Sequence, residues 1–172
     1  MIVPMGRHSI GTTVRPSTSF RFNEFKYFTA NTQLTNTNYR NVTTLKEITL
    51  PSSIQSIQNN TFDGCSSLTS CVLNEGLKTI GTNVWNFTKF VNITIPSTVT
   101  SIGGRDFAGN NALRSVIVLA KTPPATPSYN IMTAGNSSAK IYVPDDSVSA
   151  YKAASKWSEI ASRIYPLSDY NG

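Results

Sequence analysis

The middle of the chain repeats one arrangement of apolar and polar residues. The arrangement opens with six residues of which the first, fourth and sixth are apolar, as in "LKEITL" from Leu45 to Leu50. Further openings of this kind begin at Leu68, Phe90 and Leu113, so successive openings are 23, 22 and 23 residues apart. A constant period of this length is typical of a repeat architecture, and each opening predicts one short strand.

The residues after each opening also recur. Pro51 and Pro96 end the predicted strand in two units, and each unit then has two apolar positions and one aromatic position. Their members are Ile54, Leu77 and Val99, then Ile57, Ile80 and Ile102, and finally Phe62, Trp85 and Phe107. The second unit is one residue short after Ile80, which leaves either Val84 or Trp85 for its aromatic position.

A more degenerate unit precedes these four and brings the total to about four and a half. Its apolar residues are Phe22, Phe25, Tyr27, Leu34, Tyr39 and Val42. No single unit of this size can bury its apolar face alone, but stacked units place equivalent residues above one another as continuous ladders. The sequence therefore predicts a solenoid over residues 22–125.

One face of the predicted strands points away from the core. Because side chains alternate along a strand, Ile48 and Leu50 are expected to point inward and their neighbours outward. The outward positions are Glu47, Thr49, Ser70, Val72, Asn92, Thr94, Ser115 and Ile117. This regular, weakly charged row is our candidate ligand-binding surface.

The two ends of the chain lack the period. Residues 1–21 contain Pro and Gly and predict an extended N-terminal arm. The Pro-rich segment "AKTPPATPSYN" ends the ladder, and residues 126–172 predict a C-terminal closure in which "AKIYVP" forms a closing strand. The segment "DDSVSAYKAASKWSEIASRI" predicts a helix that begins at Asp145 or Asp146 and covers the last coil. Its expected apolar face contains Val148, Tyr151, Ala154, Trp157, Ile160, Ala161 and Ile164.

The units "LKEITLPSSIQSIQNNTFDGCSSL" and "FVNITIPSTVTSIGGRDFAGNNAL" resemble the leucine-rich repeats of BspA-type bacterial surface proteins. The ending "IYVPDDSVSAYKAASKWSEIASRI" is similar to the segment that closes many such arrays in gut Bacteroidetes proteins and their phages. The resemblance implies a β-rich leucine-rich-repeat solenoid of about four coils with a C-terminal capping α-helix. It also implies adhesion, with a cell-surface protein or glycan as the ligand.

The chain has fewer units than a typical surface adhesin, and its first residues do not form a signal peptide. We therefore expect a virion or cell-surface protein, with residues 1–21 attaching to other virion or anchor proteins and the solenoid facing outward. A trimer is the expected form if the protein is carried on a virion. The alternatives are a purely structural virion assembly protein and, less favoured, a hydrolase that acts on glycans.

The composition argues against two classes of partner, nucleic acids and membranes. Charged residues make up only 14% of the 172 residues, and the net charge of +6 comes from basic residues scattered along the sequence. Because nucleic-acid binding is marked by clustered Lys and Arg, we expect no nucleic-acid partner. No apolar segment is long enough to cross a membrane, so membrane insertion is not expected.

Catalytic and metal-binding patterns are not visible. Cys65 and Cys71 with Asp63 do not complete a zinc site, which requires three or four ligands. Both cysteines fall on repeat positions held elsewhere by other residues, so two core positions are favoured over a disulfide or a functional pair. His8 is the single histidine and lies in the predicted arm. We expect no catalytic residues, no metal and no cofactor.

Overall fold

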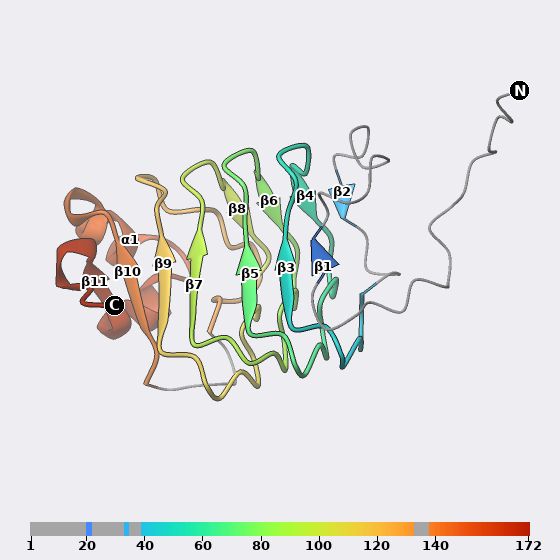
Figure 1. Cartoon of the computed structure of the whole chain (residues 1–172). Helices are drawn as coiled ribbons and strands as arrows, with labels where there is room; N and C mark the ends of the chain where they lie inside the picture. Colours follow the sequence, from blue (N-terminus) through green and yellow to red (C-terminus); the bar gives the residue numbers. More distant parts are fainter. Residues whose placement is uncertain (1–19, 22–32, 35–38, 133–137) are drawn as a thin grey trace, which may run out of the picture.

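The computed structural model describes residues 20–21, 33–34, 39–132 and 138–172. Each coil of the chain places its strands beside those of the coil before, so every paired strand is parallel to its neighbours (Figure 1). One sheet contains β1 (Phe20–Arg21), β3 (Glu47–Thr49) and β5 (Ser70–Val72). Its continuation contains β7 (Asn92–Ile95), β9 (Ser115–Val118), β10 (Lys140–Val143) and β11 (Ile164–Pro166). The opposite sheet contains β2 (Gln33–Leu34), β4 (Ser56–Ile57), β6 (Thr79–Ile80) and β8 (Ser101–Ile102).

Strand pairing follows the sequence period. Ile48 pairs with Cys71 across β3 and β5, and Ile93 pairs with Val116 across β7 and β9. On the opposite sheet, Ile80 pairs with Ile57 on one side and with Ile102 on the other. The predicted repeat solenoid is therefore confirmed, and the positions identified from the spacing are the ones that stack.

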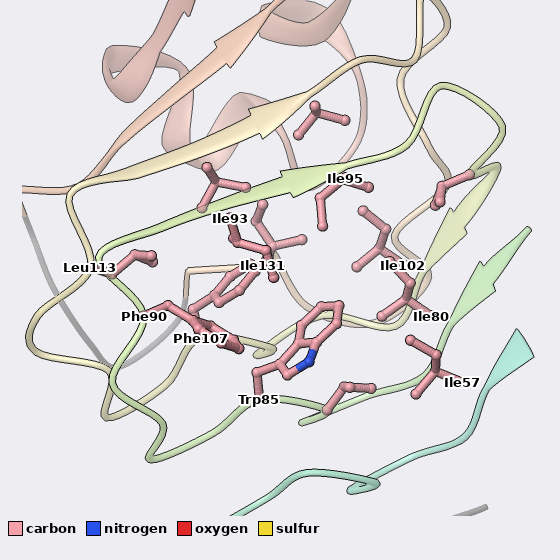
Figure 2. Packing of buried hydrophobic residues seen from close by; sticks show 14 of the residues in the cluster. Ile57, Ile80, Trp85, Phe90, Ile93, Ile95, Ile102, Phe107, Leu113 and Ile131 are labelled. Atoms are coloured by element: carbon pink, nitrogen blue, oxygen red, sulfur yellow. The ribbon is translucent and has the colours of Figure 1, made fainter. Parts of the chain in front are cut away.

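The core lies between the two sheets and consists of ladders of equivalent residues (Figure 2). The opening residues Leu45, Leu68, Phe90 and Leu113 are each completely buried. Burial of a Leu or Ile side chain stabilises a fold by about 1.5–3 kcal/mol. Because every coil contributes several such side chains, the solenoid is stabilised by contacts between neighbouring coils.

Trp85, and not Val84 alone, fills the aromatic position of the second unit. The Phe62 amide donates to the Val84 carbonyl and the Trp85 amide donates to the Asp106 carbonyl, which places Trp85 between Phe62 and Phe107. Its indole stacks on the Phe107 ring, with centroids 5.5 Å apart and planes 11° apart. The missing residue consequently lies beyond this position.

The turns that follow the opposite sheet repeat a left-handed backbone at two positions. The first is occupied by Asn60, Asn83 and Arg105, with φ of 58°, 58° and 57°. The second is occupied by Asn41, Gly64, Phe87 and Gly109, with φ of 60°, 75°, 56° and 71°. Asn and Gly adopt this conformation readily, whereas a bulky side chain is an outlier there. Phe87 is therefore the exception in its column.

The C-terminal segment caps the solenoid, but the prediction of one continuous helix is wrong. The segment begins with the 3₁₀ turn η3 (Asp145–Ser147) and the short helix α1 (Val148–Ala153). It continues through the 3₁₀ segment η4 (Ser158–Arg163) into strand β11 and ends with η5 (Leu167–Asp169). Neither η3 nor α1 has a side-chain N-cap hydrogen bond, and the Asp145 carboxylate accepts the Ser168 amide at 3.0 Å.

Two aromatic residues explain the break in the cap. The Tyr151 hydroxyl donates to the Ala120 carbonyl at 2.7 Å, and the Trp157 indole donates to the Pro124 carbonyl at 2.8 Å. The two rings meet edge to face, with centroids 4.9 Å apart. These anchors draw the chain onto the last coil, and Ile164, expected on the helix, instead pairs with Ile141 in the sheet.

The ends of the repeat also differ in detail from the prediction. Residues 1–19 of the predicted arm lie outside the described residues, as does His8, while Phe20 and Arg21 form β1 in the sheet. Phe20 pairs with Ile48, a place that the spacing assigns to Phe25. The Pro-rich segment is expected to end the ladder, but on the opposite sheet it does not. The Ile102 amide donates to the Ala125 carbonyl at 2.9 Å, which extends the ladder by one coil.

Candidate functional site: the outward sheet face

The predicted outward residues lie in two parallel rows along β3, β5, β7, β9 and β10, strands that lie side by side (Figure 1). Ladder pairing joins β3 to β5 and joins β7, β9 and β10, but in the described residues it does not join β5 to β7. The first row runs through Glu47 and Ser70, then Asn92, Ser115 and Lys140. The second row runs through Thr49 and Val72, then Thr94, Ile117, Tyr142 and Tyr165. We call these two rows the outward face.

Exposure varies along the outward face. Glu47, Val72, Asn92 and Thr94 are exposed, and Val72 retains 54% of its accessible surface. Thr49, Ser70 and Ile117 are half-buried. The residues available to a large partner are therefore concentrated on the three strands β3, β5 and β7.

Ser115 is a correction to the predicted surface, because it is only 3% exposed. Its hydroxyl donates to the Asn92 side-chain oxygen at 2.6 Å. The neighbouring strand β10 places Lys140 directly beside it. Strand pairing on both sides thus covers this small side chain, which sequence alternation alone does not reveal.

A group of tyrosines lies at the end of the second row, where Tyr142 is only 8% exposed and Tyr165 and Tyr170 are half-buried. The ring centroid of Tyr142 lies 6.1 Å from that of Tyr165 and 5.0 Å from that of Tyr170. The Lys140 ammonium lies over the Tyr165 ring, 4.9 Å from its centroid. We call Tyr142, Tyr165 and Tyr170 the tyrosine cluster. Tyrosines are enriched at protein interfaces because a ring supplies apolar area and a hydroxyl supplies a hydrogen bond.

The sequence indicates part of this cluster. Tyr129, Tyr165 and Tyr170 lie outside the repeat, where exposed rings are expected; Tyr129 is 40% exposed, but nothing in the period places Tyr165 and Tyr170 beside Tyr142. The available indication is the closing strand itself, in which Tyr142 stands between the two inward positions Ile141 and Val143. Alternation predicts that Tyr142 faces outward, next in the row after Ile117.

The buried acid Asp106 has a structural role. Its carboxylate accepts the Val84 amide at 2.9 Å and the Gly104 amide at 3.1 Å, and it is completely buried. Burial raises its pKa well above the usual value, although the two backbone hydrogen bonds act in the opposite direction. The carboxylate joins two neighbouring turns and lies away from the outward face.

The two cysteines are free thiols and belong to the core ladders, as the spacing predicts. Cys65 is completely buried and its thiol donates to the Tyr39 carbonyl at 3.0 Å. Burial raises the pKa of Cys65 to about 11 and that of Cys71 to about 12. Thiols with such pKa values are poor nucleophiles at neutral pH.

The described residues contain no cluster of three or more His, Cys, Asp or Glu side chains suited to a metal ion. Within the same residues, no helix has the length and apolar character required to cross a membrane.

Comparison with known proteins identifies one family. A sequence model of the BspA type leucine-rich repeat region matches residues 15–124 with six copies, where the spacing predicts about four and a half units. A crystal structure described as a leucine-rich repeat protein from Bacteroides ovatus ATCC 8483 is 19% identical. The match covers 69% of this chain and 44% of that chain, so less than half of that protein is represented, with a TM-score of 0.38. No curated protein matches the chain.

Proposed function

Since the chain belongs to the BspA-type leucine-rich repeat family, we propose that it is a binding module that engages a partner at a cell or particle surface through the outward face. Repeats of this family form surface modules that generally bind proteins and generally lack catalytic activity. The observation that carries the proposal is the alignment of the outward residues in two rows, in paired register within β3–β5 and again within β7–β11, with β5 and β7 side by side between them.

The character of this face supports weak contacts made many times. Its exposed residues include only one carboxylate, Glu47, and one ammonium, Lys140, while the others are neutral. A rigid neutral surface without a deep pocket offers limited affinity to one partner molecule. When many copies are displayed on one particle or cell, binding of the first copy brings the others close to their ligands. Each later contact is then effectively intramolecular, and this avidity raises the overall affinity.

A matched pair of substitutions tests the face. Thr94→Arg places a long charged side chain in the centre of the outward face, and Thr100→Arg places the same side chain on an exposed position before β8 of the opposite sheet. We expect Thr94→Arg to lower the binding of labelled protein to bacterial cells and to immobilised host-matrix proteins at least tenfold, with no change for Thr100→Arg. Equal binding by the two variants would refute the assignment. Thermal unfolding monitored by circular dichroism checks that both variants fold.

Attachment through the N-terminal arm is the finer part of the proposal, with display on a phage virion as its specific form. Deletion of residues 1–19 tests it while leaving strand β1 in place. We expect the shortened chain to bind cells normally and to be lost from purified virions. Normal incorporation would refute attachment through the arm. Loss of both properties would support an assembly protein in which the solenoid itself packs against other virion proteins. The expected trimer is tested separately, by light scattering on the purified chain.

A further inference from the structure

Exposed cations predominate at one edge of the outward face. At the edge where the strands begin, they stand at or just before β3, β7, β9 and β10; they are Lys46, Lys89, Arg114 and Lys140, with one exposed carboxylate, Glu47, at the start of β3. At the edge where the strands end, exposed carboxylates follow β5, β10 and β11; they are Glu75, Asp145, Asp146 and Asp169, with one exposed cation, Lys121, after β9. We call the four cations the basic edge. The basic residues are scattered in sequence, and the fold gathers them.

Backbone hydrogen bonds show that the basic edge crosses neighbouring coils. The Lys140 amide donates to the Arg114 carbonyl at 2.9 Å, and the Arg114 amide donates to the Val91 carbonyl at 2.7 Å. The Lys89 amide donates to the Leu68 carbonyl at 2.8 Å. Neighbouring parallel strands lie about 4.8 Å apart, so the four coil spacings from Lys46 to Lys140 extend over about 19 Å.

These cations lack acidic partners among the described residues, unlike Arg40 and Lys156. Arg40 pairs with Asp63 at 3.1 Å, and Lys156 pairs with Glu159 at 2.9 Å. In the described part of the chain, no carboxylate lies within ion-pair distance of any member of the basic edge. Lys140 contacts only the face of the Tyr165 ring, which leaves its positive charge available. The edge therefore has positive charge that no carboxylate of the described chain neutralises.

An exposed aromatic ring stands beside these cations. Phe87 is 60% exposed and Val91, two residues beyond Lys89, is 44% exposed. The backbone of Phe87 is left-handed, with φ of 56°, at a position where the neighbouring coils have Gly64 and Gly109. A bulky residue held in a strained backbone and exposed to solvent is more consistent with a contact role than with packing.

We propose that the basic edge binds a linear acidic polysaccharide, with Phe87 covering the apolar face of one sugar ring. This site goes beyond the proposed function, because it lies at the strand-start edge and shares only Lys140 with the outward face. One cation on each of several coils suits a polymer that carries charges at intervals. A single small anion needs donors that converge on one point, and the cations here are spread along about 19 Å.

The exposed aromatics favour a polysaccharide over a nucleic acid. Proteins that hold single-stranded nucleic acids combine a basic groove with a series of aromatic side chains on which successive bases stack. Of the described aromatic residues in and beside these turns, Phe87 is 60% and Tyr129 is 40% exposed, but Arg105 lies over the Tyr129 ring and Lys140 lies over the Tyr165 ring, which leaves Phe87 as the open ring. A sugar polymer needs only occasional ring contacts, so one exposed aromatic among several cations fits it better.

Two triple variants of equal charge provide the test. Lys89→Gln, Arg114→Gln and Lys140→Gln remove three charges from the basic edge, whereas Lys78→Gln, Lys121→Gln and Lys152→Gln remove three exposed charges elsewhere. Binding is measured by fluorescence anisotropy with octasaccharides of heparin and of hyaluronan at increasing salt. The heparin probe reports sulfated sugars and the hyaluronan probe reports carboxylated ones. Melting temperatures of both variants control for folding.

We expect the wild-type chain to bind at least one octasaccharide with an affinity that falls as salt rises. The basic-edge variant should lose at least tenfold in affinity, and its log-log salt slope should fall by about two to three, since each lost contact lowers the slope by about one. The control variant should keep the wild-type slope. Phe87→Asn should weaken binding at an unchanged slope, because it removes no charge.

Three results would overturn the proposal. Equal losses in the two triple variants would mean that net charge alone attracts the probe, and absence of binding to both octasaccharides at low salt would mean that there is no site. Tighter binding of a single-stranded oligonucleotide of matched charge would assign the edge to nucleic acid instead. None of these results affects the test of Thr94→Arg on the outward face, so the two proposals fail separately.

Discussion

Replacement of Phe87 by Asn is expected to change the free energy of unfolding by less than about 1 kcal/mol, although it removes an aromatic ring. The left-handed backbone of Phe87 (φ of 56°) costs a residue with a side chain roughly 1–2 kcal/mol. Asn tolerates this conformation better because its side chain hydrogen-bonds locally, and Asn41 occupies the same position of the turn two coils earlier. The substitution therefore relieves strain.

The lost packing acts in the opposite direction and is of similar size. Phe87 is 60% exposed, so about two fifths of its surface is buried. An aromatic side chain buries about 150–250 Å² in a core, which gives roughly 80 Å² here and an upper limit of about 2 kcal/mol at 25 cal/mol per Å². Trp85, which is completely buried, provides the contrast: Trp85→Ala should cost about 3–5 kcal/mol.

A second substitution separates ring contact from backbone strain. A Cβ atom added at Gly109, whose φ is 71°, would collide with the Phe87 ring of the preceding coil. Gly109→Ala should therefore cost backbone strain plus the collision in the wild-type chain, but only backbone strain in the Phe87→Asn chain. We expect a coupling energy of at least about 0.5 kcal/mol between the two positions, as for other residues in contact.

Urea unfolding followed by tryptophan fluorescence measures all four members of this cycle. Midpoints are compared at a common slope, since none of the substitutions is expected to change the surface exposed on unfolding. A loss of more than about 2 kcal/mol for Phe87→Asn would show that the ring is part of the core and that the estimate of strain is wrong. Additive effects of Phe87→Asn and Gly109→Ala would show that the ring does not rest on the next turn.

The remaining predictions concern buried groups. Burial raises the folded-state pKa of Asp106 above the unfolded value of about 3.9. The contribution of Asp106 to stability is therefore complete below about pH 3.9 and is lost as the pH rises through the raised pKa. The urea midpoint of the wild type, relative to that of Asp106→Asn, should fall from pH 3 to pH 8. Iodoacetamide at pH 8 should label Cys65 and Cys71 slowly by mass spectrometry until urea exposes them, because burial raises both pKa values. Tyr151→Phe should cost about 1 kcal/mol in thermal unfolding by removing the hydrogen bond to Ala120.

The repeat was predictable because the period is a direct consequence of stacking. Residues such as Ile48 and Cys71 occupy equivalent places in neighbouring coils, so the same apolar requirement returns at each turn of the solenoid. The cysteines could be assigned to the core for the same reason. The outward rows followed from alternation, which needs only the position of each strand.

The features that the sequence did not predict depend on contacts between distant segments. The cap is interrupted because Tyr151 and Trp157 anchor on carbonyls more than 30 residues earlier in the chain, and helical periodicity contains no information about those partners. Ser115 is covered by the side chain of Asn92 and by strand β10. Phe87 was not identified because its column of left-handed turns becomes visible only when the coils are aligned by their backbone hydrogen bonds.

One short repeat unit lies beside both the outward face and the basic edge. Backbone hydrogen bonds align Phe87 with Gly64 before it and Gly109 after it, while the next opening, Phe90, comes one residue early, so the missing residue lies just before Phe90. In the described residues, no ladder pairing joins β5 to β7 at this unit, although the two strands lie side by side (Figure 1).

Three exposed large apolar residues belong to the short unit or its junction with the next; they are Val72, Phe87 and Val91. A turn that lacks one residue cannot place its side chains as the longer turns do, and the sheet is interrupted where the strands no longer align. Val72 stands on the outward face beside this interruption, and Phe87 stands at the basic edge below it. Val72 and Val91 occupy surface columns that polar residues such as Thr49 and Arg114 fill in other coils, so apolar side chains are presented to solvent beside the one departure from the repeat in the described residues.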